Sequence, residues 1–105
     1  MTTEDLLEGL ISSGVKAYKK LNKNTSEGRK LNRHESVIIE GVEFTCWREY
    51  AVYKTAEYLS EVIPPKQVEV MLDGNNSVIT ITCDNKEQQE INRKLYLFLT
   101  KENII

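Results

Sequence analysis

The sequence predicts an α+β fold in a single domain, residues 1–105, with an antiparallel sheet of about four strands and three helices in the order α-β-β-α-β-β-α. Three observations predict it. Apolar residues recur at helical spacing in three stretches, and they alternate with polar residues in two others. Turn-forming residues divide each alternating stretch in two. With 105 residues, 40% of them hydrophobic, the chain has the usual size of one domain and can bury a core.

The first helix is expected at about residues 3–22. Thr2 or Thr3 can cap it, and acidic residues in its first turn suit the positive end of the helix dipole. One face is apolar and comprises Leu7, Leu10, Ile11, Gly14, Tyr18 and Leu21. The opposite face carries four lysines, as an exposed helix face does.

Residues 22–35 are predicted to form a polar, basic arm whose one apolar residue is Leu31. Connections longer than about 12 residues are usually functional or disordered. A short helical turn around Glu27–Asn32 is the alternative.

Strand-like residues follow from Ser36 to Trp47. After Val37–Ile39, the apolar residues Val42, Phe44 and Cys46 alternate with polar ones. Gly41 interrupts the pattern, either as part of a tight Glu40-Gly41 hairpin turn or as a bulge in one longer strand. We favour the hairpin.

The second helix is expected at about 48–62. Its apolar face comprises Trp47, Tyr50, Ala51, Tyr58, Leu59 and Val62, and Arg48 and Glu49 lie away from the centre of that face. Pro64 and Pro65 end the helix, because a proline disfavours helical geometry in the residue before it.

A second hairpin is predicted next. Val68, Val70 and Leu72 alternate with polar neighbours before an Asp73–Asn76 turn, and Ile79, Ile81 and Cys83 alternate after it.

The last segment favours a helix from about Asp84, with the stripe Ile91, Leu95, Phe98 and Leu99. A strand through 95–99 competes with it. Tyr96 and Leu97 lie off the stripe, so this helix is either covered on two sides or offers a small apolar patch. We expect Leu21, Trp47, Ile81 and Leu95 in the core.

Charge is unevenly distributed along the chain. Residues 16–34 have a net charge of +6, whereas residues 1–15 have −3 and residues 35–105 have −5. At ordinary salt a positive field reaches only about 10 Å, so this segment acts as a contact surface or not at all. The candidate binding residues are Lys16, Lys19, Lys20, Lys23, Arg29, Lys30, Arg33 and, as an aromatic off the apolar face, Tyr53. A plain solvated helix followed by a soluble loop explains the same pattern.

No motif in the sequence indicates catalysis, and we expect no enzyme and no cofactor. Cys46 lies near Arg48, yet a cysteine on an apolar strand face is far more often packing than a nucleophile. Two isolated cysteines and His34 form no metal-ligand cluster. Cysteines within apolar runs suggest reduced thiols, and the acidic N-terminus and short apolar runs favour a cytoplasmic protein without a membrane span.

Two functions remain. The first is a small accessory or inhibitor-type interaction protein that binds an acidic macromolecular surface through the basic helix and arm, with a protein as partner. The second is a nucleic-acid or nucleotide binder that uses the same cations with aromatic stacking. The calculated pI of about 5.5 favours the first, because nucleic-acid-binding domains are usually basic. Self-association is left open.

Overall fold

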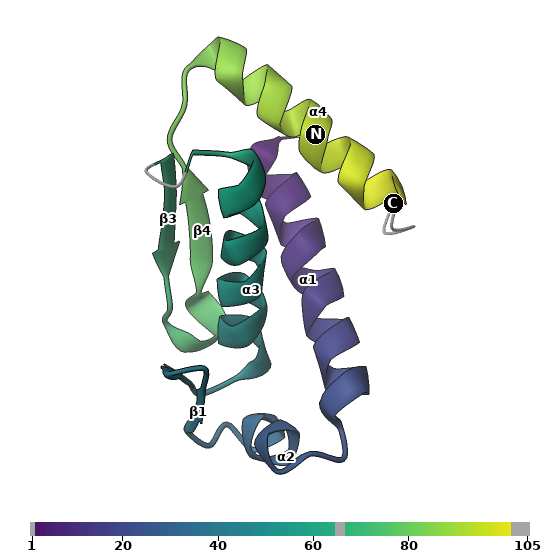
Figure 1. Ribbon diagram of the computed structural model, residues 1–105, viewed down its shortest axis with the longest axis vertical. Helices are drawn as coiled ribbons and strands as arrows, with labels where there is room; N and C mark the ends of the chain where they lie inside the picture. The colour runs from purple at the N-terminus through teal and green to yellow at the C-terminus, as the bar shows by residue number, and fades with distance from the viewer. Residues whose placement is uncertain (1, 65–66, 102–105) are drawn as a thin grey trace.

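In the computed structural model, which describes residues 2–64 and 67–101, long helices pack beside two β-hairpins (Figure 1). The helices are α1 (Thr3–Asn22), α2 (Ser26–Asn32), α3 (Trp47–Val62) and α4 (Asn85–Lys101). The strands are β1 (Val37–Ile39), β2 (Val42–Phe44), β3 (Val68–Met71) and β4 (Val78–Ile81). The expected α+β fold is confirmed, and the helices predicted at 3–22 and 48–62 begin and end within a residue of their expected bounds.

α1 lies between α3 and α4 (Figure 1). It begins with a capping box: the Thr2 hydroxyl accepts a hydrogen bond from the Asp5 N–H at 3.2 Å, and the Asp5 carboxylate accepts one from the Thr2 N–H at 3.3 Å. Small residues allow both neighbours to approach, since Gly14 faces Ala51 of α3 and Gly9 faces Leu99 of α4.

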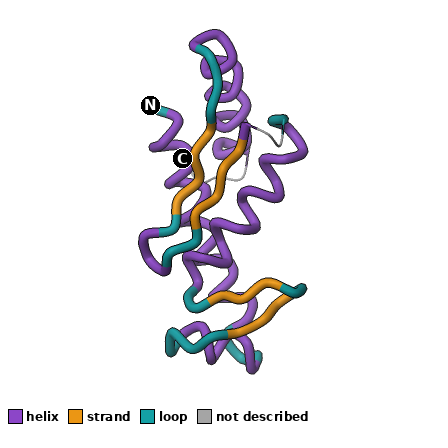
Figure 2. Tube along the Cα trace, turned by 90° about the vertical axis from the view of Figure 1, so that its left-hand side faces the viewer, coloured by secondary structure: helices purple, strands orange, loops and turns teal. Residues whose placement is uncertain are grey.

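The prediction of one four-stranded sheet is wrong. Among the described residues the strands form two separate antiparallel pairs, β1 with β2 and β3 with β4. The two hairpins run in different directions and lie at different heights along α3 (Figure 2). The buried side chains of the two hairpins, Val37 and Phe44 in one and Ile79 in the other, belong to different apolar clusters.

Two apolar clusters result. The larger joins α1, α3 and α4 with the β3–β4 hairpin. The smaller, which we call the aromatic cluster, consists of Leu31, Val37, Phe44 and Trp47, with Tyr50 and Tyr53 packed against it. Three of the residues predicted for the core have reduced exposure: Trp47 and Leu95 are buried, and Ile81 is half-buried.

Leu21 contradicts its core prediction, because 76% of it is exposed. It belongs to the apolar face of α1 by its spacing, but it lies in the last turn of the helix. In Figure 1 the last turns of α1 extend beyond α4. A residue at a core position of a helix remains exposed where its neighbours end.

α4 is a helix throughout Asn85–Lys101, so the competing strand at 95–99 is excluded. Its N-terminus is capped by Asp84, whose carboxylate accepts a hydrogen bond from the Glu87 N–H at 2.7 Å. Tyr96 and Leu97 are about half exposed. Of the two alternatives for this helix, the structure therefore shows the small apolar patch rather than cover on two sides. Pro65 and the side chains of Val62 and Phe98 lie outside the described part of the structure.

The Glu40-Gly41 turn confirms the hairpin interpretation of residues 37–44. Ile39 pairs with Val42, and both turn residues have positive φ, 54° for Glu40 and 82° for Gly41. Two consecutive left-handed residues form the two-residue turn whose twist matches that of its strands.

We expect Gly41→Ala to lower the free energy of unfolding by about 1 kcal/mol, because alanine is strained at positive φ although nothing lies near its Cβ. Gly9→Ala is the matched control. There φ is helical and the new Cβ would lie 3.8 Å from Leu99, an ordinary contact, so a gain of about 0.5–1 kcal/mol is expected. Urea unfolding of both variants measures the difference; equal effects would contradict it.

Candidate functional site

The segment predicted as a polar arm contains a helix, α2, that turns tightly against the end of α1. The Thr25 hydroxyl caps α2 by accepting a hydrogen bond from the Gly28 N–H at 2.9 Å, and it donates one to the Asn22 carbonyl at 2.9 Å. Gly28 is buried, and a Cβ there would lie 1.8 Å from the Asn22 carbonyl oxygen. Only glycine allows this approach of α2 to α1.

The side chain of Leu31 packs α2 against the rest of the molecule. Its side chain is 1% exposed and belongs to the aromatic cluster. Beside it, the Trp47 indole N–H donates a hydrogen bond to the Asn32 side-chain oxygen at 2.7 Å. The arm is therefore ordered over 26–32, where the sequence offered a helical turn only as the alternative.

The predicted cations lie on the second half of α1, on α2 and on the residues that directly follow these two helices (Figure 1). All seven are exposed, and we call them the basic surface: Lys16, Lys19, Lys20, Lys23, Arg29, Lys30 and Arg33. Arg33 forms an ion pair with Glu35. The other six form no ion pair with any residue of the described part of the chain. Six positive charges are thus not neutralised locally.

Tyr53 has a different environment. It is half-buried on α3, and its ring packs edge-on against Phe44, with 5.5 Å between the ring centroids. The structure therefore assigns Tyr53 to the aromatic cluster and shows no contact between its ring and a cation of the basic surface.

The other aromatic rings near α3 are also engaged with one another. Tyr50 packs edge-on against Tyr18, Phe44 and Trp47, with centroid distances of 4.9, 5.3 and 6.2 Å. Trp47 is 5% exposed. These edge-to-face contacts stabilise the cluster, and they leave little free ring surface for stacking.

A polar junction at the start of α3 was missed by the sequence interpretation, which put Arg48 and Glu49 away from the buried face. The Arg48 guanidinium donates to both carboxylate oxygens of Glu8, at 2.5 and 3.1 Å, and to the Ser77 carbonyl at 2.9 Å. It thereby joins α3 to α1 and to the start of β4.

Glu49 is the buried member of this junction, with 7% of its surface exposed. Its carboxylate accepts hydrogen bonds from the Thr45 N–H at 2.5 Å, the Thr45 hydroxyl at 2.6 Å and the Gly74 N–H at 3.1 Å. Burial raises the pKa of this carboxyl, but these bonds and one from the Cys46 backbone outweigh burial and hold the pKa below its ordinary value. The available signal was an acidic residue three positions after the helix cap.

Cys46 is buried, Cys83 is half-buried, and neither forms a disulfide. Across residues 2–64 and 67–101, no group of three or more His, Cys, Asp or Glu side chains could hold a metal ion. Within the same residues, no helix combines the length and apolar character needed to cross a bilayer.

Comparison of the chain with protein-family models, with curated proteins and with solved structures finds no match in any of the three.

Proposed function

We propose that this chain is a small, non-catalytic interaction protein that binds an acidic surface of a partner protein through the basic surface. The observation that carries the proposal is the set of six exposed cations without an ion pair among the described residues. Lys16, Lys19 and Lys20 lie on α1 and Lys23 directly follows it, so the four extend over about 10 Å at the helical rise of 1.5 Å per residue. α2 extends this charge with Arg29 and Lys30.

A protein partner is favoured over nucleic acid by the state of the aromatic rings. Sequence-tolerant binding of single strands needs exposed rings on which bases stack. Trp47 is buried, and Tyr53 packs on Phe44.

The test is a titration with polyglutamate and with single- and double-stranded oligonucleotides at two salt concentrations. We expect polyglutamate to bind, more weakly at the higher salt. Lys16→Glu/Lys20→Glu should weaken binding about tenfold or more, since each exposed ion pair contributes up to about 1 kcal/mol and reversal adds repulsion. The matched control is Lys86→Glu/Lys94→Glu, on exposed lysines of α4, which should bind as the parent protein does.

The same titration can contradict the proposal. Tighter binding of oligonucleotides than of polyglutamate, lost in the Lys16/Lys20 variant, would indicate a nucleic-acid binder instead. Absence of binding to either polymer at low salt would leave the cations as an ordinary solvated surface. Arg29→Ala and the double variants are expected to keep their unfolding free energy within about 0.5 kcal/mol, as exposed sites do, so lost binding can be separated from unfolding.

A further inference from the structure

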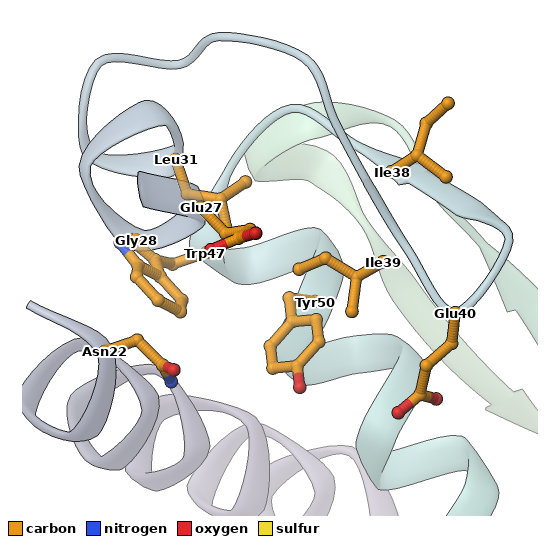
Figure 3. A pocket seen from close by; sticks show the side chains of 9 residues that line it. All are labelled: Asn22, Glu27, Gly28, Leu31, Ile38, Ile39, Glu40, Trp47 and Tyr50. Atoms are coloured by element: carbon orange, nitrogen blue, oxygen red, sulfur yellow. The ribbon is translucent and has the colours of Figure 1, made fainter. Parts of the chain in front are cut away.

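A pocket of about 360 Å³ lies between the end of α1, α2, the β1–β2 hairpin and the start of α3 (Figure 3). This volume is within the range of sites that hold small ligands or single side chains. Its walls include the aliphatic side chains of Leu31 and Ile39 and the rings of Trp47 and Tyr50. Two carboxylates, Glu27 and Glu40, complete the lining from opposite elements, α2 and the β1–β2 turn.

The charge of this lining is opposite to that of the basic surface. No lysine or arginine is among the residues that line the pocket. Glu27 is exposed and forms no ion pair with a described residue. Glu40 uses one oxygen for the Lys54 ammonium, at 3.3 Å, and its other oxygen has no bond to a described residue. An apolar wall with two acceptors matches a cationic group on an apolar stem.

The chain's own Lys54 shows that these residues hold a cation. Its ammonium nitrogen lies 5.8 Å from the centroid of the Tyr50 ring and 3.3 Å from Glu40 Oε2. Both Tyr50 and Glu40 also line the pocket. A cation over an aromatic face beside a carboxylate is thus already present next to the pocket.

We propose that the pocket binds an arginine side chain of a partner polypeptide. The planar guanidinium donates paired hydrogen bonds to a carboxylate, while its aliphatic stem packs on apolar walls. Glu27 accepts the guanidinium hydrogen bonds, Glu40 adds negative charge on the other side of the pocket, and Leu31 and Ile39 contact the stem. This inference is independent of the proposed function, because the ligand has the opposite charge.

Trp47 provides the measurement, since it is the only tryptophan in the chain and lines the pocket. Its fluorescence is titrated with N-acetyl-arginine amide, with the N-acetyl-citrulline amide that keeps the shape without the charge, and with N-acetyl-glutamate amide. We expect a saturable change with the arginine compound only. The affinity for an isolated side chain should be millimolar, because the nearby basic surface repels cations. A citrulline compound that binds equally well, or no saturation with arginine, would overturn the proposal.

Two charge-removing variants decide whether the carboxylates take part. Glu27→Gln is expected to weaken arginine binding about fivefold, which corresponds to about 1 kcal/mol, the upper value for an exposed ion pair. Glu43→Gln removes an equally negative, exposed side chain from β2, outside the pocket lining, and should leave the affinity unchanged. Equal arginine affinities of Glu27→Gln and Glu43→Gln would reject the carboxylate site. Polyglutamate binding tests the basic surface separately, so its failure would contradict the proposed function and not this pocket.

Discussion

Replacing Leu31 by alanine is expected to lower the free energy of unfolding by about 2–5 kcal/mol, the usual cost of truncating a fully buried leucine. Leu31 is 1% exposed and is the apolar contact that joins α2 to the aromatic cluster. The loss should appear in urea unfolding followed by far-UV circular dichroism. The same variant should also weaken polyglutamate binding, because α2 positions three of the seven cations.

Leu21→Ala is the matched control for this prediction. Leu21 has the same chemistry and lies ten residues earlier, but it is 76% exposed, so its truncation should cost less than about 0.5 kcal/mol. The reverse result, a large loss at Leu21 and a small one at Leu31, would mean that α2 does not pack as described.

Replacing Glu49 by alanine is expected to cost about 3 kcal/mol at pH 7. The substitution leaves the Thr45 and Gly74 donors without their buried acceptor, and hydrogen bonds to a charged group contribute about 1.5–3 kcal/mol each. Glu49→Gln should cost less, because its amide oxygen still accepts part of this set. The exposed Glu43→Gln serves as control and should stay within about 0.5 kcal/mol.

The contribution of Glu49 should also depend on pH. Because its folded-state pKa is lowered, the charged carboxylate favours the folded state above the ordinary pKa of 4.5. This stabilisation is lost as the pH falls below 4.5 and through the folded-state pKa. We therefore expect the difference in unfolding free energy between the parent protein and Glu49→Gln to be largest at pH 6–7 and to shrink at pH 3. A difference that grows on acidification would contradict the assigned shift.

Local patterns in the sequence predicted most of the elements correctly. The stripe Leu7, Leu10 and Ile11 and its capping residues specify α1, and Pro64 limits α3, because these signals act within a few residues of one another. The Glu40-Gly41 turn follows from the same kind of local signal. The exposure of Lys16, Lys19 and Lys20 also agrees with their place opposite the apolar stripe of α1.

The errors concern contacts between distant parts of the chain. Spacing put Leu21 in the core and left Leu31 in an arm, but burial depends on which neighbours lie beside each residue. The sheet was expected to be continuous because alternation shows that a strand has a buried face, not which strands pair. The sequence placed Arg48 and Glu49 at the surface because it does not show their partners, Glu8 and Gly74, which lie in other elements.

By itself the sequence determined the helices, the two hairpins and the unequal distribution of charge, since periodicity, caps and turn residues are short-range properties. Only the tertiary structure decided that α2 folds against α1, that the hairpins stay apart and that acidic and aromatic residues form a pocket beside the basic surface. The pocket and the separate hairpins depend on side chains that are distant in sequence, and the position of α2 depends on the burial of Leu31 against Phe44 and Trp47, so no local pattern encodes these contacts.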